Sequence, residues 1–246
     1  MGEKSVIVLL TAAILWSGSE FLAAQEEELD KREKVYATKR MKMVDEQIAR
    51  RGVRDKRVLE AMRVVKRHEL VPERYRSQAY DDHPLPIGEG QTISQPYIVG
   101  LMSELLSSEP GEKILEIGTG SGYQAAVLAE MDLEVYTIEI IEALAARAAG
   151  DLKRMGYPDV RVRWGDGYAG WPSQAPFDGI IITAAPPKLP QPLIEQTKVG
   201  GRIVVPEGKG VQDLNVYTRQ EDGSVTVKRV IPVRFVPMTG KAQKGN

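Results

Sequence analysis

The segment that most constrains the fold is Lys113–Ala129, which reads KILEIGTGSGYQAAVLA. A short apolar strand runs directly into a turn that carries Gly118, Gly120 and Gly122, and a helical pattern follows from Tyr123. A strand, a glycine-rich turn and a helix in this order are typical of the ligand-binding unit of open α/β sheets. Glycine lets the backbone approach a ligand and adopt positive φ, and the helix start offers free N–H groups. We therefore expect an α/β fold with a doubly wound, mostly parallel sheet.

The spacing of the glycines distinguishes this turn from a dinucleotide-binding one. A dinucleotide site reads G-x-G-x-x-G, whereas Tyr123 stands where the third glycine would be. Glu116 lies two residues before the first glycine, where a carboxylate would repel a pyrophosphate and attract an α-amino or sulfonium group. A second acid, Glu139, follows the next predicted strand, Glu134–Ile138, at the place where an acid typically holds ribose hydroxyls. These residues indicate S-adenosylmethionine and disfavour a nicotinamide dehydrogenase.

Further segments are expected to complete the sheet. Ile141–Met155 is Ala-rich and predicts a helix, and Val160–Trp164 predicts the strand after it. Phe177–Thr183 is almost continuously apolar, as is typical of a central strand buried on both faces. The remaining strands are expected at Gly200–Val205, Leu214–Thr218 and Val225–Phe235, the last two as a hairpin around Asp222-Gly223.

Open α/β sheets bind ligands beyond the carboxyl ends of their strands, so the residues at these ends should converge on the cofactor. The predicted cofactor-binding residues of this kind are Glu116, Gly118, Thr119, Gly120, Gly122, Glu139, Ile140, Asp166 and Gly167. Two of the acids have structural alternatives. Asp166 could cap a helix or form an Asx turn, and Glu139 could cap the helix that starts near Ile141.

The amino-terminal quarter of the chain differs in character from the rest. Residues 1–25 contain one early lysine, an apolar run and then small residues, which is typical of a secretory signal peptide; an uncleaved anchor or a misassigned start are the alternatives. Residues 26–78 predict a helical extension, with Gly52 closing one helix and Asp55 starting the next. Between Lys31 and Arg76 there are 16 Lys/Arg and 7 Asp/Glu, which indicates either a solvated helical face or an anionic partner.

Ala79–Gln95 has no helical or strand period and is rich in Pro and Gly. A loop of this length inside a compact domain is usually functional or disordered, and its small polar residues beside Ile87 and Ile93 favour an ordered binding loop. Pro96 suits the first turn of the helix that follows, with Ser94 or Gln95 near its cap.

Composition excludes several classes of chemistry. The 246 residues include no cysteine and only two histidines, so a disulfide, a thiolate zinc site or a thiol nucleophile is excluded and no metal is expected. The net charge of −1 gives no general attraction to nucleic acid.

Five segments together resemble the protein-L-isoaspartate (D-aspartate) O-methyltransferase family. They are LPIGEGQTISQPY at Leu85–Tyr97, LEIGTGSGYQAAVLA, GDGYAGWP, APFDGIIITAAP and GGRIVVP, in the family's order over residues 40–237. The first is specific to the family, whereas other methyltransferases share only the glycine turn. The resemblance implies a Rossmann-like methyltransferase domain at residues 79–238 with a substrate loop at 79–97. The residues after Met238 themselves predict a disordered tail at 239–246.

The resemblance implies a repair reaction on damaged proteins. S-adenosyl-L-methionine would methylate the free α-carboxylate of L-isoaspartyl and D-aspartyl residues, and the ester would collapse to a succinimide. Ser94 matches the family's active-site residue and could orient the acceptor carboxylate, although it could also cap the Pro96 helix. Thr92, Ile93 and Gln95 are expected to line the cofactor site. Because a carboxylate is already ionised at neutral pH, no general base is needed.

The resemblance also implies a cytoplasmic monomer that binds no nucleic acid and no membrane. The apolar leader departs from the family pattern and leaves export to the periplasm as the alternative. Two other functions stay open: an S-adenosylmethionine methyltransferase on another substrate such as tRNA, and a non-catalytic exported binding protein on the same fold. Near-neutral charge and the specific loop disfavour the first, and the presence of Glu116, Glu139 and Ser94 disfavours the second.

Overall fold

The computed structural model describes residues 25–243, so the predicted leader lies outside the described residues except for its last position. The chain divides into two compact units, one ending at Met41 and the other beginning at Lys42. The first unit is helical from residue 25 and carries exposed ion pairs with helical spacing, Lys31–Glu27 and Lys34–Asp30. Among residues 25–243, no helix has both the length and the apolar character needed to cross a bilayer.

The second unit begins with irregular helical turns. A π-helical turn, η1 (Met43–Ile48), leads into a 3-10 turn, η2 (Ala49–Arg51). Gly52 closes it with φ of 106° and donates its N–H to Ala49, which confirms the predicted helix end. Asp55 accepts the N–H of Arg57 at 2.8 Å and starts α2, as predicted. The helices here are α2 (Lys56–Val64), η3 (Arg67–Leu70) and η4 (Glu73–Gln78).

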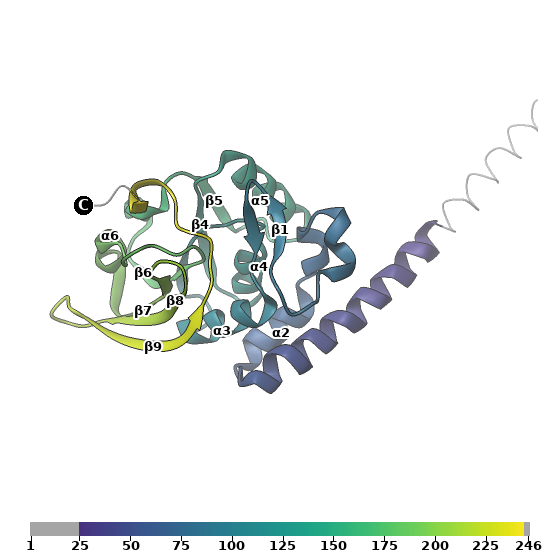
Figure 1. The fold of residues 1–246 in the computed structure, drawn as a ribbon, viewed down its shortest axis with the longest axis horizontal. Coiled ribbons are helices and arrows are strands. Elements are labelled where there is room, and N and C mark those ends of the chain that lie inside the picture. The colour runs from purple at the N-terminus through teal and green to yellow at the C-terminus, as the bar shows by residue number, and fades with distance from the viewer. Residues whose placement is uncertain (1–24, 244–246) are drawn as a thin grey trace, which may run out of the picture. The chain divides into compact units, whose positions relative to one another are not determined.

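A seven-stranded sheet forms the centre of this unit, in the order β5-β4-β3-β6-β7-β8-β9. The strands are β3 (Lys113–Ile117), β4 (Glu134–Glu139), β5 (Arg161–Trp164), β6 (Phe177–Ile182), β7 (Thr197–Glu207), β8 (Gln212–Arg219) and β9 (Val225–Val233). β3 to β7 are parallel, and β8 and β9 continue the sheet in antiparallel fashion. Figure 1 shows β5 beside α5 at one edge and β9 at the other. The predicted fold class is confirmed.

Helices cover both faces of the sheet. The main helices are α3 (Pro96–Leu106), α4 (Tyr123–Glu130), α5 (Glu142–Arg154) and the short α6 (Gln191–Glu195). Successive residues of a strand point to opposite faces. In β3, Leu115 and Ile117 belong to a buried cluster that contains Leu193 of α6. Ile114 points the other way, where a Cβ added to Gly179 would lie 3.1 Å from both Ile114 and Leu106 of α3. Glu116 therefore lies on the face that α3 covers.

The predicted loop contains regular structure that the sequence did not reveal. β1 (Leu85–Gly88) and β2 (Gln91–Ile93) form an antiparallel hairpin, so the interpretation of this stretch as lacking strands was wrong. Glu89 and Gly90 form the turn with positive φ values of 53° and 68°. Strands of three and four residues are too short for an alternating pattern to stand out.

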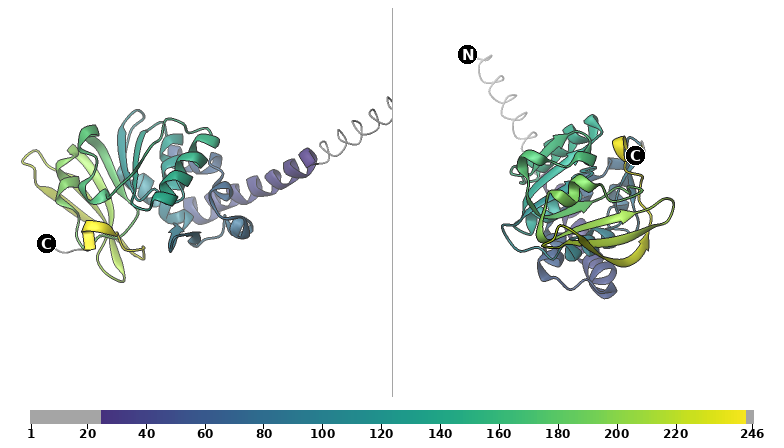
Figure 2. Two further views of the ribbon diagram at one scale, coloured as in Figure 1. Left: turned by 90° about the horizontal axis from the view of Figure 1, so that it is seen from above. Right: turned by 90° about the vertical axis from the view of Figure 1, so that its left-hand side faces the viewer.

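The carboxyl-terminal segment is also more ordered than predicted. Met238 is buried, Pro237 pairs with Ala185, and residues Gly240–Gln243 form a 3-10 turn, so the expected disorder is wrong for residues 239–243. Figure 2 shows this segment returning from β9 across the strand ends. β9 ends at Val233, two residues before the predicted end at Phe235. β7 begins at Thr197, three residues before the predicted start at Gly200.

Candidate active site

A pocket lies at the carboxyl ends of β3, β4 and β6. It brings together ten of the predicted site residues, namely Thr92, Ile93, Ser94, Glu116, Gly118, Thr119, Gly120, Glu139, Ile140 and Gly167. Gln95, Gly122 and Asp166 are not among its lining residues. We refer to this pocket as the cofactor pocket.

Glu116 is the most unusual group in the pocket because it is fully buried. The Thr137 hydroxyl donates to its Oε2 at 2.5 Å, and the Thr119 hydroxyl lies 2.6 Å from that of Thr137. Its Oε1 atom has no hydrogen-bond partner in the described part of the chain. Burial raises the pKa of Glu116 to about 8, and the nearby charge of Glu139 acts in the same direction. The pocket thus contains an acceptor atom that a cationic donor group would satisfy.

Glu139 ties the glycine turn to the end of β4. Its Oε2 accepts the N–H of Gly120 at 2.8 Å, and its Oε1 accepts the N–H of Ile141 at 3.0 Å. The N-cap residue of α5 is Ile141 and no side chain caps that helix, so Glu139 stabilises the turn before the helix and does not cap it. Each carboxylate oxygen can accept a further hydrogen bond, so ribose contact stays a prediction.

Two glycines lie where a side chain would not fit. At Gly118 φ is +99°, and an added Cβ would lie 2.5 Å from the Thr183 hydroxyl, which itself donates to the Gly118 carbonyl at 2.6 Å. An added Cβ at Gly167 would lie 2.4 Å from Ile117. The segments after β3 and β5 therefore pack so closely against neighbouring strands that neither position has room for a side chain.

Gly122 and Asp166 have structural roles beside the pocket. Gly122 is the N-cap of α4 with φ of 83°. Asp166 accepts the N–H of Tyr168 at 2.9 Å and the N–H of Lys241 at 2.9 Å. This is the capping geometry that the sequence left open for Asp166, and it also anchors the carboxyl-terminal segment. Contact between Asp166 and a cofactor remains a prediction.

Ser94 lies where the cofactor pocket meets a second cavity. This second cavity, the acceptor groove, shares Thr92, Ser94, Thr183 and Val236 with the cofactor pocket. Its other lining residues are Arg51, Pro84, Gln95, Tyr97, Ile98, Val211 and residues 231–235. The N-cap of α3 is Gln95 and no side chain caps that helix, so Ser94 does not act as a cap. Residues 25–243 provide no hydrogen-bond partner for its hydroxyl, which leaves it available to a ligand.

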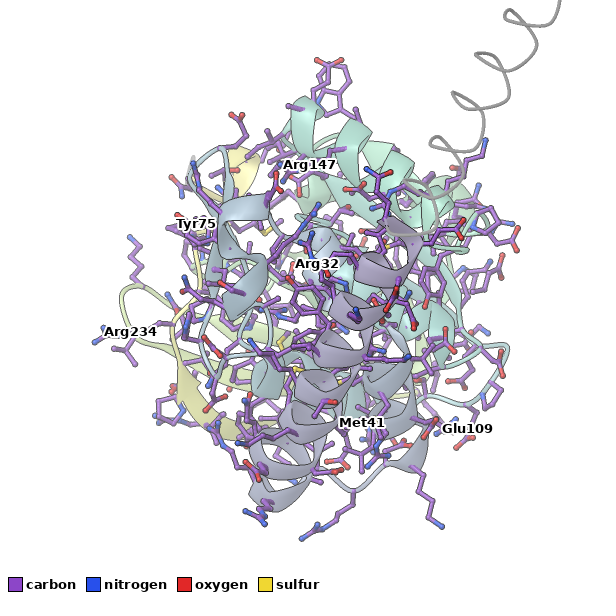
Figure 3. All side chains as sticks on the ribbon, turned by 90° about the vertical axis from the view of Figure 1, so that its right-hand side faces the viewer. Arg32, Met41, Tyr75, Glu109, Arg147 and Arg234 are labelled. Atoms are coloured by element: carbon purple, nitrogen blue, oxygen red, sulfur yellow. The ribbon has the colours of Figure 1, made fainter. Side chains whose placement is uncertain are left out.

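The sequence missed the contribution of the carboxyl-terminal segment. Val236, Pro237, Met238 and Thr239 line the cofactor pocket, although the last of them was assigned to a disordered tail. Arg234, just before them, lines the acceptor groove and projects outward from the protein (Figure 3). The only available signal was the short apolar run Phe235–Met238 after the last strand.

Comparison with known proteins identifies the family. Residues 38–243 match the family described as protein-L-isoaspartate(D-aspartate) O-methyltransferase (PCMT). The chain belongs to this family. It is 57% identical over 199 residues to the protein-L-isoaspartate O-methyltransferase of Gloeobacter violaceus, which covers 80% of this chain and 97% of that relative. The resemblance drawn from the loop and the glycine turn is therefore confirmed.

Solved structures show the same fold. A protein-L-isoaspartate O-methyltransferase superposes with a TM-score of 0.75 and 27% identity, covering 82% of this chain and 67% of that one. A second structure, from Plasmodium falciparum, is described as a beta-aspartate methyltransferase (PCMT) in complex with S-adenosyl-L-homocysteine. It superposes with a TM-score of 0.71 at 23% identity and covers 81% of this chain and 98% of that one.

Proposed function

We propose that the protein transfers a methyl group from S-adenosyl-L-methionine to the free α-carboxylate of L-isoaspartyl and D-aspartyl residues in damaged proteins. The observation that carries this proposal is the position of Ser94, whose unpartnered hydroxyl lies between a pocket with a buried carboxylate and a second, open groove. A transferase needs this arrangement because donor and acceptor must meet from opposite sides.

The cofactor pocket fits S-adenosylmethionine chemically. The orphaned Oε1 of Glu116 suits a positively charged amino or sulfonium group. The glycine turn would hold the same end of the cofactor, Glu139 the ribose, and Ile140, Asp166 and Gly167 the adenine. When bound, the cofactor supplies an electrophilic methyl group on a sulfonium centre.

The chain's own residues position the acceptor rather than activate it. Because a carboxylate is ionised at neutral pH, catalysis requires orientation and exclusion of water and no proton transfer. The Ser94 hydroxyl would donate a hydrogen bond to one acceptor oxygen and leave the other directed at the methyl group. The hairpin β1–β2 and residues Val236–Thr239 would close the pocket around the reacting atoms.

The decisive test is transfer of labelled methyl groups to matched peptides. The purified protein should label an isoaspartyl peptide and leave the same peptide with normal Asp unlabelled. A Ser94→Ala variant should lose about 100-fold in turnover while its cofactor affinity stays within about threefold. Equal labelling of both peptides, or labelling of tRNA alone, would refute the proposed function.

We also propose that the enzyme acts as a monomer in the cytoplasm, where S-adenosylmethionine is made. Sedimentation of the purified protein tests the monomer. Cell fractionation with amino-terminal sequencing of the mature chain tests the compartment, and a chain that starts near residue 25 in a periplasmic fraction would establish export instead.

A further inference from the structure

Arg51 reaches the acceptor groove from the end of η2 and is held there by two different contacts. Its Nη1 donates to Asp82, with distances of 3.0 Å to Oδ2 and 3.3 Å to Oδ1. Its guanidinium carbon lies 3.5 Å from the centroid of the Tyr97 ring. A planar guanidinium suits both contacts at once, because it stacks on an aromatic face while its edge donates hydrogen bonds.

Asp82 connects this arginine to the segment that carries Ser94. The Gln95 amide donates to Asp82 Oδ1 at 2.7 Å and to the Asp82 carbonyl at 3.1 Å. Asp82 therefore joins Arg51 to Gln95, while Arg51 separately covers Tyr97. We call Arg51, Asp82, Gln95 and Tyr97 the acceptor clamp.

The clamp holds one side of Ser94, and the hairpin holds the other. Ile93, directly before Ser94, is buried and pairs with Leu85 in β1. Gln95 and Tyr97, directly after it, are the clamp contacts. Because the Ser94 hydroxyl has no partner of its own within residues 25–243, its position depends on these neighbours.

We propose that Arg51 is a positioning residue that orients Ser94 toward the acceptor carboxylate through Asp82, Gln95 and Tyr97. This inference rests on the proposed function. The side chains of Arg51 and Asp82 are each 42% exposed, and an ion pair of this exposure contributes little to stability. Loss of the clamp should therefore appear in turnover and leave the folded state nearly as stable as before.

The test is Arg51→Gln compared with Arg63→Gln. Arg63 is the matched control because it forms a similar ion pair with Asp45 at 2.9 Å, in the same helical region but outside both pockets. Arg51→Gln should lower kcat on an isoaspartyl peptide about tenfold, with the Kd for S-adenosylmethionine within twofold of wild type. The kcat of Arg51→Lys should lie between those of wild type and Arg51→Gln, because lysine keeps the positive charge but cannot stack a planar group on Tyr97. Arg63→Gln should match wild type.

A double variant tests whether Arg51 affects kcat through Ser94 or independently of it. In the Ser94→Ala background, Arg51→Gln should lower kcat less than twofold, because the hydroxyl that Arg51 positions is already absent. A tenfold loss in that background would overturn the inference, and so would an unchanged kcat for Arg51→Gln in the wild-type background.

Hydrogen exchange provides a readout that does not depend on residual activity. Arg51→Gln and Asp82→Asn should both speed exchange in peptides covering residues 91–98 and leave residues 116–122 unchanged. Unchanged exchange at 91–98 in both variants would overturn the inference. If wild-type protein fails to label the isoaspartyl peptide, the proposed function fails; if it succeeds and Arg51→Gln equals it, only the role of Arg51 fails.

Discussion

The cofactor pocket and the acceptor groove meet at Ser94 but are built in opposite ways. The cofactor pocket lies at strand ends, and its central acid, Glu116, is fully buried and accepts a hydrogen bond from Thr137. The acceptor groove is lined by residues of η2, β2, α3 and β9 and by the loops beside them, and its Arg51 pairs with Asp82 although both side chains are 42% exposed. Under the proposed function the cofactor is always the same molecule, whereas damaged proteins vary, so a pocket with a buried acid suits the first and an exposed groove suits the second.

This difference predicts that changes in the cofactor pocket alter stability and binding together. Changes in the acceptor groove should alter turnover with little effect on stability. The variants below test that contrast, and they follow in order of decreasing expected effect.

Gly118→Ala should have the largest effect. The added Cβ would lie 2.5 Å from the Thr183 hydroxyl at a φ of +99°, which should lower the free energy of unfolding by about 3 kcal/mol and abolish detectable cofactor binding. Gly111→Ala is the matched control, because its φ is +81° but nothing lies within 4 Å of the added Cβ. That control should lose about 1 kcal/mol in chemical denaturation. Equal losses in the two variants would show that the close approach at Gly118 is unimportant.

Glu116→Gln should change how stability depends on pH. The pKa of Glu116 is about 8 in the folded protein against an ordinary value of 4.5, so between these values the folded state holds a proton that the unfolded state has released. The contribution of this group to the free energy of unfolding is fully present below pH 4.5 and falls as pH rises toward 8, by about 1.4 kcal/mol per pH unit. Denaturation of the cofactor-free protein from pH 5 to 8 measures it. The Gln variant should lack this slope, and parallel profiles for the two proteins would contradict the expectation.

Asp166→Ala should have a smaller effect, at the boundary of the cofactor pocket. The variant loses the hydrogen bonds that Asp166 accepts from the backbone N–H groups of Tyr168 and Lys241. The free energy of unfolding should fall by about 1 kcal/mol. Proteolysis should cleave the carboxyl-terminal segment faster in the variant. Asp222→Ala is a suitable control, since Asp222 also accepts a local backbone N–H, from Ser224, but lies in the exposed β8–β9 turn. Unchanged cleavage in Asp166→Ala would show that Asp166 does not hold this segment.

Arg51→Gln should have the smallest effect on stability of all, below 1 kcal/mol, despite its loss of turnover. If it destabilised the protein as much as Gly118→Ala, the contrast between the two regions would fail.

Prediction from sequence succeeded where the pattern is local. Gly52, Asp55 and Pro96 each mark a helix boundary as expected, since caps depend on a few neighbouring residues. The buried strand β6 was recognisable from its apolar run. The hairpin β1–β2 was not, because strands of three and four residues are too short to show an alternating pattern. The ordered end at Met238 was not, because this segment is held by a contact with a distant residue, Ala185.

The sequence by itself determined the fold class and the family, and it predicted ten residues that line one pocket of the structure. These follow from strand periodicity, from a glycine turn preceded by an acid, and from the segment around Ser94. Only the tertiary structure decided that Glu116 keeps one oxygen unpaired, that Asp166 anchors the carboxyl-terminal segment, and that Arg51 meets Asp82 and Tyr97. Arg51 and Asp82 are 31 residues apart along the chain. No local pattern encodes such a contact, because it exists only once the chain has brought separate elements to the same groove.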